Sequence, residues 1–267
     1  MTALKKPLLA GALLMVAAML PMTLMDSTAK ALQQSGLHPL QVIWARFTSQ
    51  TVIVFLVLSP NLRSLLRTNY PKMQFIRSVF LFGATMCFFI SLGLMEIASA
   101  TAVFEMAPLL IIRPGSDVFS FATLLPVAAA FFYGCFAVST RFLGQGESAW
   151  TSFIYTAVFG TLVATLIVPF YWSPPSGSEI IMMSLIGGFG AVGHYLLIRS
   201  LMLAEASYLA PFGYVSLVYN TVWGVLFFDE YPDIWVYAGA SVIVGAGLYV
   251  WYRELKAGAE TPVVQPR

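Results

Sequence analysis

The sequence predicts an all-α fold, a polytopic membrane helix bundle, and three observations support this. The chain of 267 residues is 59% hydrophobic and only 10% charged, whereas charged residues make up about a quarter of an ordinary soluble domain. Its apolar residues fall into stretches of about 20, the length of helix that crosses ~30 Å of hydrocarbon. Segments of alternating polarity, which a membrane β-barrel needs, do not occur in the sequence.

Nine apolar segments are candidates for this bundle. Lipid offers no partner for an exposed peptide group, so each segment is expected to be helical, and the Pro and Gly inside it mark kinks or close contacts. Lys5 and Lys6 before the first segment, and "TAKA" (28–31) after it, imitate a signal peptide. We nevertheless expect that segment to remain as the first span, because eight more segments follow it. In order, the segments lie near residues 8–25, 40–59, 75–95, 97–112, 118–140, 149–172, 180–200, 206–228 and 234–252.

Similar stretches recur in the two halves of the chain. "LLMVAA" (13–18) matches "LLPVAA" (124–129), and the same offset aligns Lys30 with Arg141. "LMEIAS" (94–99) also resembles "MLAEAS" (202–207). Internal repeats of this kind are common in transporters. We therefore predict a first repeat at 1–117, a second at 118–254 and a cytoplasmic tail at 255–267.

The first copy lacks a stretch of sequence that the second copy contains. The second copy continues without a break from 215 to 254, whereas the first passes directly from "APLL" (107–110) to "IIRPG" (111–115). Since "IIRPG" aligns with "YVWYR" (249–253), about 30 residues of the second copy have no counterpart in the first. The junction joins the front of a fourth helix to the back of a fifth.

The distribution of Lys and Arg tests the topology. If all nine segments cross with the N-terminus inside, seven basic residues are cytoplasmic and six are external, which gives no bias. If segment 97–112 returns or fails to cross, only Lys30 and Arg113 are external, and the positive-inside rule strongly favours this arrangement. Both termini are then cytoplasmic. The eleven inside residues are Lys5, Lys6, Arg63, Arg67, Lys72, Arg77, Arg141, Arg199, Arg253, Lys256 and Arg267.

Several motifs, in their order and spacing, resemble one family. They are "WARF" (44–47), "EIASATAVFEMAPLL" (96–110), "IIRPG" (111–115), "HYLLIRSLMLAEASYLAPFGY" (194–214), "FFDEYPD" (227–233) and "GAGLYVWYRE" (245–254). Over residues 8–254 the chain resembles the drug/metabolite transporter superfamily, EamA type. The resemblance implies ten helices in two inverted five-helix repeats, from which this chain departs by one missing or shortened helix in the first repeat. The second half resembles members that import riboflavin or S-adenosylmethionine and members that export amino acids.

Polar residues inside the apolar segments are candidates for function, because ionisable groups in a span are costly. Arg46 and Glu105 lie at similar depth, where an ion pair would neutralise both charges. The alternatives are a pair that fixes the packing, an anchor for a solute or ion, and a position in a solvated outer vestibule. His194, in a row of glycines, either binds solute or hydrogen-bonds across a tight helix contact. Asp26 and Lys30 are expected to form a pair at the rim. The candidate substrate-binding residues are Arg46, Glu105, Tyr133, Tyr155, His194, Tyr214, Tyr219 and Asn220.

These features predict an inner-membrane secondary transporter of a small organic metabolite, planar or amphipathic, working by alternating access. The expected partners are membrane lipid and the solute, with a homodimer left open, and we expect no cofactor, no metal and no nucleic acid. The sequence contains no motif of a membrane enzyme, and Arg46, Glu105 and His194 do not make a triad. The alternative is a non-transporting, internally deleted relative of the family.

Reporter fusions test the topology. Fusions after residues 72, 145 and 256 are all expected to report a cytoplasmic position, because segment 97–112 does not complete a crossing. The measurement is the paired activity of a cytoplasmic and a periplasmic reporter at each site. An external signal at residue 145 would contradict the return of this segment.

Overall fold

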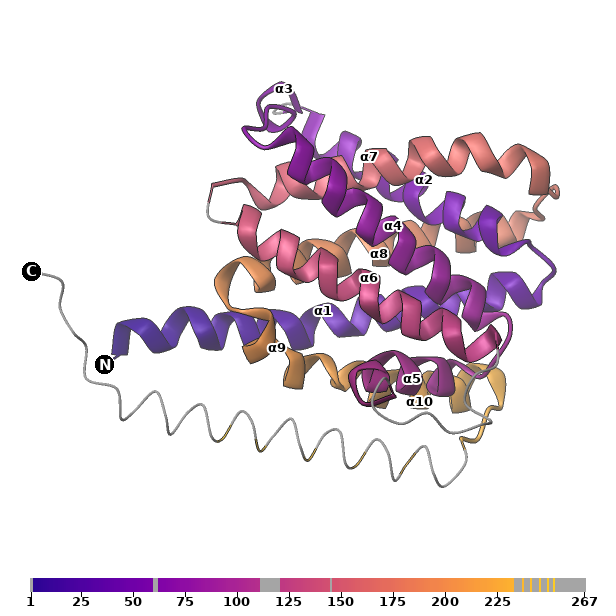
Figure 1. Ribbon diagram of the computed structural model, residues 1–267. Coiled ribbons are helices and arrows are strands. Elements are labelled where there is room, and N and C mark those ends of the chain that lie inside the picture. Colours follow the sequence, from indigo (N-terminus) through magenta and orange to yellow (C-terminus); the bar gives the residue numbers. More distant parts are fainter. Residues whose placement is uncertain are drawn as a thin grey trace, which may run out of the picture.

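A computed structural model of the protein describes residues 2–59, 62–110, 121–144 and 146–232, and five further positions, Tyr237, Ser241, Gly245, Tyr249 and Tyr252. The prediction of an all-helical membrane bundle is confirmed for this part of the chain, in which seven helices are long and apolar enough to cross a membrane. Figure 1 shows them lying roughly side by side. The elements are α1 (Thr2–Gln34), α2 (Pro39–Leu58), α3 (Leu62–Leu65), α4 (Pro71–Leu92), α5 (Ile97–Leu110), α6 (Phe121–Leu143), α7 (Ala149–Ile167), η2 (Val168–Tyr171), α8 (Gly177–Leu203), α9 (Ala206–Gly213) and α10 (Val215–Phe228).

The predicted segments correspond to these helices with three differences. Helix α1 runs on to Gln34, nine residues beyond the predicted end, because no Gly or Pro stops it before Gly36. The eighth segment is divided at Tyr214 into α9 and α10. The four-residue helix α3 lies between the second and third predicted segments, where no helix was expected. Helix α5 begins at Ile97 as predicted and is described as far as Leu110. The junction at 111–115 and most of the ninth segment lie outside the described residues.

The helix connections gather at two ends of the bundle. At one, which we call the Lys30 end, Ser35 donates to Glu179 and Gln41 donates to the Ser173 carbonyl. At the other, the Arg141 end, the Asn69 N–H donates to Glu147. Helix α1 runs from the Arg141 end to the Lys30 end and α6 runs the opposite way (Figure 1).

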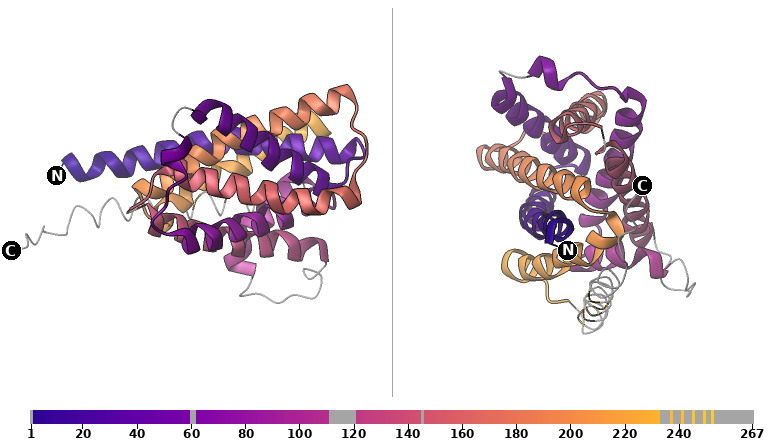
Figure 2. Two further views of the ribbon diagram at one scale, coloured as in Figure 1. Left: turned by 90° about the horizontal axis from the view of Figure 1, so that it is seen from above. Right: turned by 90° about the vertical axis from the view of Figure 1, so that its left-hand side faces the viewer.

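Helix α1 lies between α8 and the pair α9–α10, as the end-on view in Figure 2 shows. It packs along α8 and also contacts α9 and α10. The "TAKA" stretch is part of this packed helix, where Ala29 is fully buried. Glycines of α8 allow the close approach: a Cβ on Gly193 would lie 2.6 Å from Met22 Cγ of α1, and one on Gly187 would lie 2.7 Å from the Gln50 backbone nitrogen of α2.

Arg77 corrects one step of the charge analysis, which counted it as a cytoplasmic residue. It lies six residues into α4 and is 0% exposed. Its Nε donates to Thr140 Oγ1 at 2.7 Å, and Nη1 donates to the Ser152 carbonyl at 2.7 Å and to Thr156 Oγ1 at 2.6 Å. Arg77 is close in sequence to the loop before α4, but its side chain is enclosed by α6 and α7.

The glycines of α8 give a stability test. Gly187→Ala is expected to lower the free energy of unfolding by about 1–3 kcal/mol, because the new methyl group overlaps the α2 backbone. Gly188→Ala is the matched control: a Cβ there meets nothing within 4 Å, so it should be neutral or slightly stabilising. Denaturant titration of both variants in micelles measures the difference. Equal unfolding energies would contradict the packing of α8 on α2.

Candidate functional site

A cavity of about 400 Å³ lies inside the bundle. Its walls come from α1, α2, α4, α5, α6, α8, α9 and α10, and most of its lining residues are apolar. The cavity reaches the surface between α6 and α9, where the lining residues Gly134, Val138 and Ala210 are exposed. Its polar residues therefore stand out as the groups that can orient a solute.

Arg46 forms the first polar centre of the cavity. Its guanidinium is 1% exposed and donates from Nη1 to Thr85 Oγ1 and from Nη2 to His194 Nε2, the latter at 3.0 Å. A guanidinium has only donors, so this histidine nitrogen must be the acceptor. The Asp26 carboxylate on α1 interacts electrostatically with the same guanidinium. Asp26, Arg46 and His194 thus combine one negative group, one positive group and one titratable ring.

Glu105 forms the second polar centre, on α5. Its Oε1 accepts a hydrogen bond of 2.8 Å from Ser216 Oγ of α10. The Glu105 carboxylate also interacts electrostatically with the hydroxyl groups of Tyr133 and Tyr214. The expected Arg46–Glu105 ion pair is wrong: both side chains line the cavity, but each has other partners.

The structure brings six of the eight predicted residues to this cavity: Arg46, Glu105, Tyr133, His194, Tyr214 and Asn220. Asn220 is 1% exposed and donates from Nδ2 to Thr101 Oγ1 at 2.8 Å. Two predicted tyrosines lie elsewhere. The Tyr155 hydroxyl donates to the Leu66 carbonyl at the Arg141 end, and Tyr219 packs against the apolar core outside the cavity lining.

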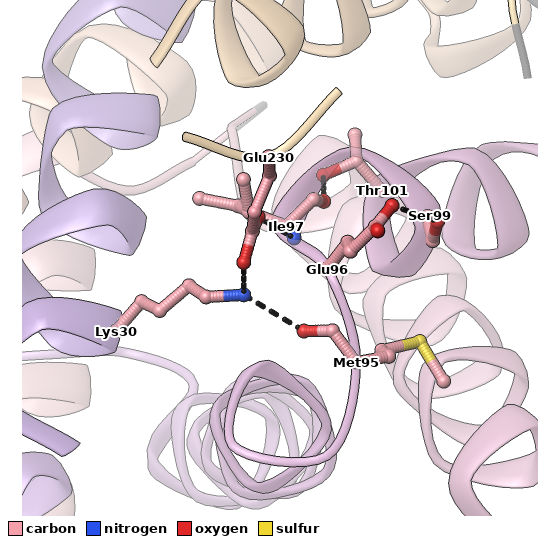
Figure 3. A network of polar contacts seen from close by, with 7 residues as sticks. All are labelled: Lys30, Met95, Glu96, Ile97, Ser99, Thr101 and Glu230. Carbon is pink, nitrogen blue, oxygen red and sulfur yellow. Dashed lines mark hydrogen bonds and ion pairs between the residues drawn. The ribbon is translucent and has the colours of Figure 1, made fainter. Parts of the chain in front are cut away.

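The expected Asp26–Lys30 rim pair is also wrong. Lys30 Nζ lies 2.5 Å from Glu230 Oε1 and donates to the Met95 carbonyl at 2.9 Å, while Asp26 faces the cavity. The second oxygen of Glu230 accepts the Ile97 N–H at 3.1 Å. Figure 3 shows Glu230 between the two donors. One carboxylate therefore ties α1 and the start of α5 to the loop after α10.

Asp26 is the main cavity residue that the sequence analysis left out of its site. The predicted first segment ended at residue 25, so a carboxylate at residue 26 was assigned to the rim. The uninterrupted helical sequence up to Gly36 was the signal that could have placed Asp26 inside the span. Among the described residues, no three His, Cys, Asp or Glu side chains come together as metal ligands do.

Comparisons with known proteins now give this geometry a context. No protein-family model matches the chain. It is 22% identical to an S-adenosylmethionine uptake transporter of Rickettsia felis, over 83% of this chain and 85% of the relative. It is 24% identical to the pseudopaline exporter CntI of Pseudomonas aeruginosa, over 88% of this chain and 94% of the relative.

A further relative matches over a shorter stretch. The riboflavin transporter of Rhizobium johnstonii is 30% identical over 59% of this chain and 53% of its own length. A solved crystal structure covers 90% of this chain and 96% of its own, with a TM-score of 0.66 and 18% identity, which shows a shared fold. The protein is thus a multi-pass membrane protein related to bacterial transporters.

The ion pair at the Lys30 end yields a stability prediction. Glu230→Gln is expected to lower the free energy of unfolding by about 3 kcal/mol, because it leaves the buried Lys30 ammonium without a countercharge. Thermal or denaturant unfolding in micelles measures the loss.

Glu96→Gln serves as its control, since the Glu96 carboxylate is exposed and bonds only to Ser99 among the described residues. This change should alter stability by less than about 1 kcal/mol. An equally small effect of both substitutions would show that the Lys30–Glu230 contact does not hold the helices together.

Proposed function

We propose that this chain is an inner-membrane secondary transporter of the drug/metabolite transporter superfamily, EamA type, which moves a small organic solute by alternating access. The observation that carries the proposal is the cavity inside the bundle, with charged and aromatic walls, in a chain whose relatives are named as transporters. Ionisable side chains inside a bundle are costly and mark solute or ion pathways. Enzymatic chemistry has no comparable support.

The packing of the helices supports two inverted repeats, at 1–117 and 118–254. The first repeat contains α1, α2, α4 and α5, and their counterparts in the second are α6, α7, α8 and α9–α10. When each helix is replaced by its counterpart, the principal helix–helix contacts are the same. Thus α1 packs on α8 as α6 packs on α4, and α2 contacts its own counterpart α7. Rocking of one repeat against the other would then expose the cavity to each side in turn.

Two equivalent hydrogen bonds support the same proposal. Lys30 donates to the Met95 carbonyl at 2.9 Å, and Arg141, its counterpart by the sequence offset, donates to the Met202 carbonyl at 2.7 Å. Each acceptor carbonyl lies where the third long helix of a repeat leads to its fourth element: Met95 comes three residues after α4, and Met202 is in the last turn of α8. With both termini in the cytoplasm, Lys30 lies at the external end and Arg141 at the internal end.

We assign solute binding to Arg46, Glu105, Tyr133, His194, Tyr214 and Asn220, and add Asp26. Rings of Phe88, Phe104 and Tyr133 line the same space, which suits a planar or amphipathic solute. Riboflavin, S-adenosylmethionine and amino acids are the candidate classes, the first two from the names of the relatives.

The absent stretch between the fourth and fifth helices is part of this proposal. The alignment with the Rickettsia felis transporter extends over 251 positions yet takes in 83% of the 267 residues, or about 222, so about 29 positions have no counterpart here. Such a gap agrees with the junction predicted at 111–115. It also supports the alternative, a non-transporting relative that keeps the bundle.

Solute uptake tests the proposal. In proteoliposomes supplied with labelled S-adenosylmethionine, riboflavin or amino acids, Arg46→Ala and Glu105→Gln are each expected to reduce uptake at least ~10-fold, the equivalent of about 1.4 kcal/mol. The reason is that each change removes a charged group from the cavity.

Tyr219→Phe is the control, because Tyr219 lies outside the cavity, and it should leave uptake unchanged. If no solute moves with this chain, but one moves when a version carrying the absent helix is used, the non-transporting alternative is correct.

A further inference from the structure

The two carboxylates of the cavity differ in their surroundings. Asp26 shares its site with the Arg46 guanidinium. Glu105 has Ser216 as its hydrogen-bond donor. Among the described residues neither carboxylate has a basic side chain within 4.0 Å, but the Arg46 guanidinium interacts electrostatically with Asp26, and no basic side chain there does so with Glu105. In this part of the chain, the charge of Glu105 therefore lacks the compensation that Asp26 has.

Arg46 is not free to balance Glu105. Its Nη1 and Nη2 are held by Thr85 and His194, from α4 and α8. Its guanidinium carbon also lies 4.7 Å from the centre of the Phe47 ring and 5.4 Å from that of Phe89. These contacts hold the guanidinium against α4 and α8.

Aromatic rings lie next to Glu105 in a continuous series. The ring centres of Phe88 and Phe104 are 5.4 Å apart, and those of Phe104 and Tyr133 are 5.5 Å apart. All three residues line the cavity. Aromatic faces attract a cation, most strongly where water is excluded, and a carboxylate beside them adds a full negative charge.

From this arrangement we infer that the cavity selects solutes carrying a positive group, such as a sulfonium or quaternary ammonium, which sits between Glu105 and the rings of Phe104 and Tyr133. A cationic solute supplies the countercharge that Glu105 does not receive from any described basic side chain. A neutral solute of the same shape leaves the buried carboxylate uncompensated, which costs free energy. The inference deepens the proposed function by naming its solute class.

Equilibrium binding tests the charge preference without requiring transport. Calorimetry on the full chain in nanodiscs compares two pairs of probes, each a cation and its neutral analogue. One pair is S-adenosylmethionine and S-adenosylhomocysteine, which differ by one methyl group and the positive charge on sulfur. The other is choline and 3,3-dimethyl-1-butanol. We expect the cation of each pair to bind at least ~10-fold more tightly.

Variants connect this preference to Glu105. In Glu105→Gln the ratio of the two affinities should fall close to one, whereas Glu105→Asp, which keeps the charge, should retain the preference. Glu96→Gln is the matched acid-to-amide control outside the cavity and should leave the ratio unchanged.

The inference is overturned if the neutral member of each pair binds as tightly as the cation, if neither cation binds, or if the Glu105→Gln variant keeps the full preference. Failure of the transport proposal gives a different result, in which the cations bind selectively but no labelled solute enters proteoliposomes.

Discussion

Helix α8 approaches α1 and α2 more closely than ordinary side chains would allow, and the site depends on that approach. Gly187 faces the α2 backbone and Gly193 faces Met22 of α1. Lipid is as apolar as the interior of the bundle, so helices associate through close packing and hydrogen bonds rather than through the hydrophobic effect. Because α8 lies so near α2, His194 reaches the Arg46 guanidinium, and one side of the cavity is fixed.

The two buried arginines bond to neighbouring helices through most of their donors, although Arg46 Nε and Arg77 Nη2 have no hydrogen-bond partner among the described residues. Arg46 bonds to side chains of α4 and α8, and Arg77 bonds to groups of α6 and α7. An arginine whose N–H groups had no hydrogen-bond acceptors in hydrocarbon would raise the free energy of the folded protein by several kcal/mol. The same contacts that meet this requirement also lock the relative positions of the helices. Glu105 accepts a hydrogen bond from one hydroxyl group, that of Ser216, and we infer that its charge is the one available to a solute.

Sequence reasoning identified most of the polar cavity residues, because a charged or amide side chain in an apolar segment is conspicuous. It was wrong about their partners. Depth along a helix can be counted from the sequence, so Arg46 and Glu105 were correctly seen as buried, but the direction of each side chain around its helix axis cannot. The same limitation applied to Lys30, whose true partner Glu230 is 200 residues away in the chain. For the same reason, the sequence analysis wrongly placed Tyr155 and Tyr219 in the cavity.

The sequence by itself determined that this protein is a helical membrane bundle, since peptide groups in lipid must bond within their own helix and the apolar stretches have the length of a span. It also indicated that Arg46, Glu105 and His194 lie within the spans, because composition and spacing are local properties, but it assigned Asp26 and Lys30 to the rim and Arg77 to the cytoplasm. Only the tertiary structure decided that Asp26 belongs to the cavity, that Arg46 pairs with His194, and that Glu105 has no basic neighbour among the described residues. These relations depend on how helices distant in the chain rotate and approach one another, and that is set by the packing of the whole bundle.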